Sequence, residues 1–248
     1  MSEWLEELWS PVEIAARLRI EFPDEPTMWV SHETIYTSLY VQGRGELRRE
    51  LVRCLRSGRT ERKPRSRLER RSGPIRDKVM ISERPAEVAD RAVPGHWEGD
   101  LILGAGGRSA VGTLVERSTR FVLLLHLAEG KSAENVRDAM IKAIRTLPAE
   151  LARSITWDQG TEMSKHKDFT VETGVQIYFC DPYSPWQRGS NENTNGLLRQ
   201  YMPKGTDLSL ITKDELDRIA RSLNNRPRET LGFMKPSEKL AELLATTD

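Results

Sequence analysis

Short runs of apolar residues, split by turn residues, dominate the chain between positions 96 and 183. Three successive strand-like runs are HWEGDLILG (96–104), SAVGTLVERST (109–119) and RFVLLLHLA (120–128). SITWDQG (154–160) and VQIYFCD (175–181) are two more. SAENVRDAMIKAIRTL (132–147) has apolar residues at helical spacing after Ser132, a suitable N-cap, and the polar stretch 162–174 could be a second helix. A helix after the last strand completes the order β-β-β-α-β-α-β-α, which predicts an α/β fold with a mixed five-stranded sheet flanked by helices.

The first 40 residues have a helical pattern instead. WSPVEIAARL (9–18) offers Ser10 as N-cap, Pro11 at the first helical position and Glu13 for a capping box. A second helix is predicted from SHETIYTSLY (31–40), with apolar residues on one side. Its polar positions suit the base edges of a DNA major groove, and we assign them to DNA binding: Ser31, His32, Thr34 and Thr37. A plain helical hairpin explains the pattern equally well, and the connection is longer than in a typical helix-turn-helix.

Charge is concentrated between these two regions. Residues 44–78 hold 14 Arg or Lys against 5 Asp or Glu, so +9, although the whole chain carries only +1. Leu47, Leu51 and Leu55 predict a helix in the first part, and no periodicity follows Gly58. We therefore predict a helical DNA-binding segment over 1–57, a basic linker over 58–90 that could follow a phosphate backbone, and an α/β core over 91–248, whose catalytic role rests on the residues considered below.

Composition restricts the possible classes of protein. No apolar run approaches the roughly 18 residues that a membrane-spanning helix needs, and the acidic N-terminus is unlike a signal peptide. Cys54 and Cys180 are far apart and suggest reduced thiols, and the four histidines show no zinc-binding spacing. These features favour a cytoplasmic protein.

Three carboxylates stand out in the predicted core. Asp100 lies inside the first strand, Asp158 ends the fourth, and Glu192 opens the helix after the fifth. If the first and fourth strands are neighbours, all three can converge. Like charges repel, but Mg²⁺ would reverse that balance. Each acid alone also has a structural interpretation, as an edge residue, a turn residue or a helix-dipole partner.

Several neighbouring residues remain alternatives or additions to this trio. Other candidate acids are Glu98, which points to the same face of its strand as Asp100, Glu116 and Asp181. Candidate phosphate contacts are Arg188, Asn193, Lys204 and, with a helix-dipole role as the equal alternative, Arg226. His166 is interpreted as a supporting or structural residue.

Six stretches in a fixed order carry a family resemblance over nearly the whole chain: WSPVEIAARL, VSHETIY, GHWEGDLILG, TWDQGTEMSKH, YSPWQRGSNENTNGLLRQYMPKGTDL and NNRPRETLGFMKPSE. The chain resembles insertion-sequence transposases of the IS-thirty group, whose core has the ribonuclease-H-like fold shared with retroviral integrases. The resemblance implies that Asp100, Asp158 and Glu192 form a DDE site for two Mg²⁺ or Mn²⁺ ions.

The same resemblance implies a reaction and its partners. The enzyme would cleave double-stranded DNA at transposon ends and transfer the freed strand into target DNA, as a homodimer or higher oligomer in the bacterial cytoplasm and nucleoid. Members usually carry a further helix-turn-helix before the segment that starts at Trp9. A catalytically silent, truncated copy that binds DNA and represses a full-length relative is therefore the alternative, and a structure-selective nuclease is a third hypothesis.

Overall fold

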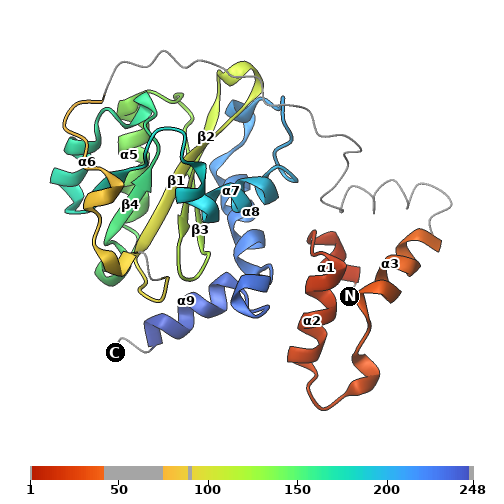
Figure 1. The fold of residues 1–248 in the computed structure, drawn as a ribbon. Helices are drawn as coiled ribbons and strands as arrows, with labels where there is room; N and C mark the ends of the chain where they lie inside the picture. The colour runs from red at the N-terminus through yellow and green to blue at the C-terminus, as the bar shows by residue number, and fades with distance from the viewer. Residues whose placement is uncertain (1, 42–74, 89–90, 246–248) are drawn as a thin grey trace. The chain divides into compact units, whose positions relative to one another are not determined.

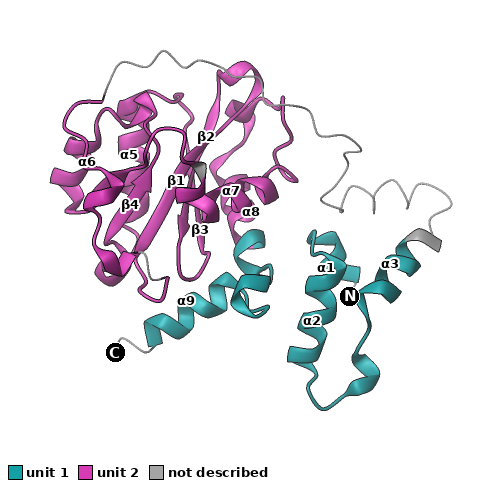
Figure 2. Ribbon diagram, in the orientation of Figure 1, with its two compact units in different colours: residues 1–68, 222–248 teal, residues 69–221 magenta. Residues whose placement is uncertain are grey.

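The computed structural model describes residues 2–41, 75–88 and 91–245. The chain divides into two compact units, residues 1–68 with 222–248 and residues 69–221 (Figure 2). The C-terminal residues thus group with the N-terminal helices, whereas the sequence placed them with the core; the three-part division stays a prediction. The helix expected over residues 44–57 and most of the basic stretch lie outside the described residues.

The second unit is built on five strands in the order β3-β2-β1-β4-β5 (Figure 1). The strands are β1 (His96–Leu103), β2 (Ala110–Glu116), β3 (Val122–His126), β4 (Ser154–Trp157) and β5 (Gln176–Phe179). The β1–β2 and β2–β3 pairs are antiparallel, and the β1–β4 and β4–β5 pairs are parallel. The mixed sheet is confirmed, and so is the expectation that the first and fourth strands are neighbours.

Helices cover the two faces of this sheet differently (Figure 1). On one side lie α5 (Ala133–Ile144) and α6 (His166–Thr173), which contact each other and the edge strands β3 and β5. On the other side α7 (Gly189–Leu198) contacts β1 and β2. Ser132 is the N-cap of α5, as predicted, and its side chain accepts a hydrogen bond from the Asn135 amide. The three-layer arrangement follows from apolar residues at helical spacing in α5 and at alternate positions in the strands.

In the described part of the other unit, the N-terminal helices are α1 (Ser2–Glu6), α2 (Pro11–Glu21) and α3 (His32–Val41). The capping box of Ser10 and Glu13 starts α2, as the sequence predicted. These helices share a small apolar core of Leu5, Trp9, Ile14, Ala15, Leu18 and Ile35.

The C-terminal part of the chain contains α8 (Lys213–Asn225) and α9 (Pro236–Ala245). Arg226, 3% exposed, forms an ion pair with Glu13 at 3.0 Å, and Arg17 donates to Glu238 at 2.8 Å. Arg226 is therefore a buried structural residue of this unit, since its guanidinium is not presented to solvent. Short 3₁₀ segments are Pro26–Met28, Ile81–Glu83, Ala86–Val88, Ala105–Gly107, Ala149–Leu151, Thr161–Met163, Pro185–Arg188, Leu208–Leu210 and Glu229–Leu231.

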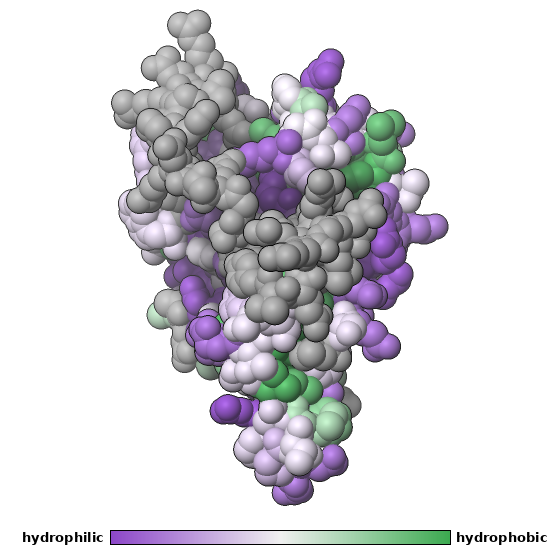
Figure 3. Space-filling model, turned by 90° about the vertical axis from the view of Figure 1, so that its right-hand side faces the viewer, coloured by the Kyte–Doolittle hydropathy of each residue, from purple (hydrophilic) through white to green (hydrophobic). Residues whose placement is uncertain are grey.

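Hydrophilic residues make up most of the described surface in the view of Figure 3, with hydrophobic residues in small patches. Within the described ranges, no helix combines the length and apolar character needed to cross a membrane. Cys180 is a free, buried thiol, whereas Cys54 lies outside the described residues.

Candidate active site

Strand β1 separates two kinds of side chain. Trp97 belongs to the apolar core, whereas Glu98 and Asp100 point to the opposite, polar face because successive strand residues alternate. Gly99 returns to the apolar face, where an added Cβ would lie 2.1 Å from the Trp157 ring. The absence of a side chain at position 99 therefore lets the Trp157 indole pack directly against the backbone of β1, on the face opposite Glu98 and Asp100.

Parallel pairing of β1 with β4 brings two of the predicted acids to the same level of the sheet. Glu98 pairs in register with Thr156, so Asp158, which directly follows the last residue of β4, comes level with Asp100. Asp158 also accepts a hydrogen bond from the Gly160 amide, so its turn role is present as well. The predicted approach of these two carboxylates follows directly from the strand order.

A guanidinium lies between the two aspartates. Arg188 is 3.3 Å from Asp100 Oδ1 and 3.4 Å from Asp158 Oδ2, and it donates to the Gly99 carbonyl at 2.9 Å. Burial raises the pKa of Asp100, and the charge of Asp158 adds to this, although Arg188 opposes it. Burial acts to lower the pKa of Arg188, but the charges of the two aspartates outweigh it and raise that pKa. Arg188 was expected at DNA phosphates; here it is the counter-ion of the aspartates, and a contact with DNA stays a prediction.

Glu192 differs from this pair in its exposure to solvent. It is the fourth residue of α7, one helical turn after Arg188, and its side chain is exposed. Across the part of the chain that is described, no three His, Cys, Asp or Glu side chains are grouped closely enough to hold a metal ion. Two of the three predicted acids therefore converge, and the part played by Glu192 stays a prediction.

Amide side chains attach α7 to the polar face of the sheet. Asn195 donates to Asp100 Oδ2 at 3.0 Å, and Asn191 donates to the Glu98 carbonyl at 2.9 Å. The buried Thr113 hydroxyl lies 3.0 Å from Asn191 Oδ1 and 3.3 Å from Asn195 Oδ1. Because residues four apart share a helix face, the asparagine-rich sequence here serves the helix–sheet interface. Sequence reasoning missed this; the 191/195 spacing was the available signal.

The alternative acids all have structural partners. Glu98 is 1% exposed, and its Oε2 accepts the amides of Ser190 and Asn191. Glu116, fully buried, accepts hydrogen bonds from the turn after β2. Asp181 pairs with Gln187 in the loop before α7. All three carboxylates therefore accept hydrogen bonds that stabilise local structure.

The remaining predicted site residues lie on the surface or in the core. In α3, the side chains of His32, Thr34 and Thr37 are exposed, and Ser31 caps the helix by accepting the Thr34 amide. Two further candidates, Asn193 and Lys204, are exposed as well. Contacts of all these residues with DNA stay predictions.

His166 is buried in α6. It lies within hydrogen-bond distance of the Met163 carbonyl and packs edge-on against Phe179. Its interpretation as a structural residue is consistent with this environment.

The donor set at the two aspartates fits a hard divalent cation. Two carboxylates already converge on one cationic group, the Arg188 guanidinium, and Mg²⁺ is bound in proteins through one or two carboxylates with water completing its shell. Asn195 holds one of these carboxylates in orientation. The chemistry of the pair is therefore suited to Mg²⁺ or Mn²⁺.

Comparison with protein families gives the class of the core. Residues 90–185 match the model described as "Integrase core domain". This range contains all five strands and both aspartates and ends shortly before α7. The mixed sheet with flanking helices has the ribonuclease-H-like architecture of that class.

Full-length comparisons are more specific. The chain is 55% identical to the transposase for insertion sequence element IS1086 of Cupriavidus metallidurans, over 98% of this chain and 71% of the relative. It is 45% identical to transposase InsI for element IS30C of Escherichia coli, over 99% of this chain and 64% of the relative. A third relative, the transposase for element IS4351 of Bacteroides fragilis, is 39% identical over 95% of this chain and 70% of its own length. The chain belongs to the IS-thirty family of insertion-sequence transposases.

Proposed function

We propose that this transposase carries out DNA transposition by metal-dependent strand cleavage at the ends of an insertion sequence, followed by transfer of the freed strand into target DNA. The observation that supports this most directly is the convergence of Asp100 and Asp158 on one cationic position. It occurs in a chain whose relatives are named transposases and whose core matches the integrase core.

Asp100 and Asp158 would hold divalent ions, and Glu192 would be the third acid of a DDE site with two Mg²⁺ or Mn²⁺ ions. Such ions activate a water or a 3′-hydroxyl and stabilise the charge on the scissile phosphate. Ionised carboxylates are required for this, so metal binding should weaken as the pH falls and the carboxylates become protonated. Asn195 keeps the Asp100 carboxylate oriented.

Double-stranded DNA is the proposed substrate and target. The exposed polar positions of α3 would read the terminal repeats, and a homodimer or larger oligomer would hold two ends together. We expect the protein in the bacterial cytoplasm. The chain matches 64–71% of the length of the three relatives compared above. The DNA substrate and the oligomeric state are therefore proposals for this chain.

The direct experiment uses the purified chain and duplexes carrying the element's terminal repeats. Cleavage and joining should require Mg²⁺ or Mn²⁺, and Asp100→Asn should abolish both without preventing DNA binding. Activity that survives Asp100→Asn would reject the assignment. Cutting that ignores the terminal sequence would indicate a structure-selective nuclease, and binding without cleavage in either metal would indicate the silent DNA-binding copy.

A further inference from the structure

Helix α7 begins without a cap from its own sequence. The N-cap position is Arg188, whose guanidinium carries only hydrogen-bond donors and so cannot accept from the helix amides; it is directed to the two aspartates instead. The first N–H groups of a helix have no partner inside the helix and need one from elsewhere, commonly a Ser, Thr, Asp or Asn at the N-cap. At α7 the missing acceptor has to come from another part of the fold.

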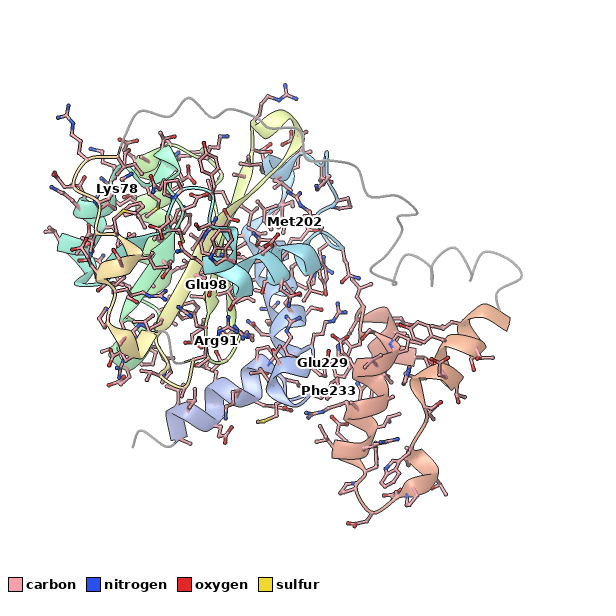
Figure 4. All side chains as sticks on the ribbon, viewed as in Figure 1. Lys78, Arg91, Glu98, Met202, Glu229 and Phe233 are labelled. Carbon is pink, nitrogen blue, oxygen red and sulfur yellow. The ribbon has the colours of Figure 1, made fainter. Side chains whose placement is uncertain are left out.

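Glu98 on β1 supplies it. Its Oε2 atom accepts the Ser190 amide at 2.9 Å and the Asn191 amide at 3.0 Å, the second and third residues of α7. The Glu98 carbonyl also accepts from Asn191 Nδ2 at 2.9 Å. Figure 4 labels Glu98, which lies on β1 beside α7. A strand residue 92 positions earlier in the chain thus does the work of an N-cap.

Charge explains how this carboxylate can be buried. Its other oxygen, Oε1, lies 3.5 Å from Nε of Arg117, which is itself largely buried. The N-terminal end of a helix carries partial positive charge and also favours an anion. Glu98 is therefore held between a guanidinium and a helix start, and an uncharged side chain would serve neither partner as well.

The position of Glu98 connects this cap to the acids. Glu98 and Asp100 are two residues apart on the same face of β1. The residue before α7 is Arg188, the counter-ion of both aspartates, and Glu192 follows the capped amides directly. We propose that Glu98 is a positioning residue of the active site: it fixes the start of α7 against β1 and thereby sets Arg188 and Glu192 relative to Asp100 and Asp158. This inference rests on the proposed metal-dependent function.

The experiment compares two buried glutamates on adjacent strands. Glu98→Gln keeps the shape but loses the charge, and Glu98→Asp keeps the charge but draws the carboxylate back toward β1 and away from the α7 amides. Glu116→Gln is the matched control, because Glu116 is fully buried and bonds to the turn after β2 and to the Gly95 amide. Readouts are hydrogen exchange over residues 189–195 without metal or DNA, Mn²⁺ affinity of the DNA-free protein by paramagnetic resonance, and the cleavage rate at saturating DNA.

In both Glu98 variants, the amide hydrogens of α7 should exchange faster than in the wild type. Mn²⁺ binding should weaken about tenfold, because removal of groups that orient metal ligands generally has an effect of this size. Cleavage should be slower, but the DNA concentration that gives half-maximal cleavage should not change. Glu116→Gln should lower the melting temperature but leave Mn²⁺ affinity within about twofold of the wild type. If Glu98→Gln fails to fold, Glu98→Asp decides the question.

The proposal would be overturned if both Glu98 variants had the same amide exchange and the same Mn²⁺ affinity as the wild type. It would also be overturned if Glu116→Gln lost as much Mn²⁺ affinity as the Glu98 variants. A wild-type protein that neither binds Mn²⁺ nor cleaves DNA would reject the proposed function instead. In that case the exchange of the α7 amides still decides whether Glu98 caps the helix.

Discussion

The two faces of the central sheet use the same strands for opposite purposes. The face under α5 and α6 belongs to a continuous apolar core that includes Trp97, Trp157 and Phe169. The face under α7 is lined by polar groups such as Glu98 and Thr113, each with a partner on the helix. The difference shows how alternation along a strand lets one segment stabilise the fold and hold reactive groups at once.

The two faces also carry different physical costs. Apolar burial stabilises in proportion to area and requires no particular partner atom for each group. A buried polar face is stable only when each donor and acceptor has a partner, because an unsatisfied group costs about 1–3 kcal/mol. The polar side chains under α7 must therefore be placed more accurately than the apolar side chains under α5 and α6. The same accuracy is required of the groups in the proposed active site.

The sharpest contrast comes from two consecutive residues on opposite faces. Trp157→Ala should lower the free energy of unfolding by about 3–5 kcal/mol, since a fully buried indole would leave a cavity. Asp158→Asn should leave the fold intact but reduce cleavage by about a thousandfold or more, because a metal ligand, the role we propose for Asp158, contributes several kcal/mol to the transition state. Urea unfolding and single-turnover cleavage measure the two effects.

An exposed carboxylate on α6, Asp168, provides the control for that pair, since Asp168→Asn should change neither quantity appreciably. If Asp158→Asn unfolded the protein as strongly as Trp157→Ala, the separation of roles between the faces would be wrong.

Gly99 tests the apolar face from within β1. An added Cβ would meet the Trp157 ring at 2.1 Å, so Gly99→Ala should cost about 1–3 kcal/mol of stability through overpacking. Pairing it with Trp157→Phe should restore part of the loss, because the smaller ring leaves room. Additive losses in the double variant, measured by thermal or urea unfolding, would contradict this contact.

Thr113 tests the polar face with an isosteric change. Thr113→Val keeps the shape but removes the hydroxyl beside the two asparagines of α7, which should cost about 1–2 kcal/mol and slow cleavage. The change Val111→Thr on the same strand is the comparison: Val111 is 1% exposed, so the variant should lose stability without a specific effect on cleavage. If Thr113→Val and the wild type cleaved DNA at the same rate per folded molecule, the Thr113 hydroxyl would make no contribution to the active site.

Cys180, whose thiol is affected by the charge of Arg188, gives the smallest expected effect, a change in thiol reactivity. Burial raises the pKa of its thiol to about 11, although Arg188 opposes this. At pH 8 roughly one thiol in a thousand is ionised, so alkylation should be far slower than in urea. Because the folded pKa is above the unfolded one, ionisation should lower stability as the pH rises from about 8.5 towards 11. Mass spectrometry of the Cys180 peptide across pH gives the measurement, and rapid alkylation in native buffer at pH 8 would contradict it.

Much of the fold could be predicted from local pattern. The five strands, the Ser132 cap of α5 and the Ser10–Glu13 capping box all depend on residues within a few positions of one another. The approach of Asp100 and Asp158 was also predictable, because it follows from strand order.

The interior of the site was not predictable in the same way. That Arg188 would turn to the aspartates and Glu98 to the start of α7 depends on which buried groups lack partners after folding. Such information is tertiary and leaves little trace in spacing. For Glu192, position in the helix was correctly predicted, but exposure and surroundings depend on packing that the pattern does not encode.

The 92-residue separation between Glu98 and the amides of α7 has a consequence for biosynthesis. While the ribosome is still producing the chain, β1 and β4 can already meet, but the glutamate has no helix to hold until residue 191 has left the exit tunnel. The proposed active site can therefore be assembled only after α7 has followed all five strands out of the ribosome.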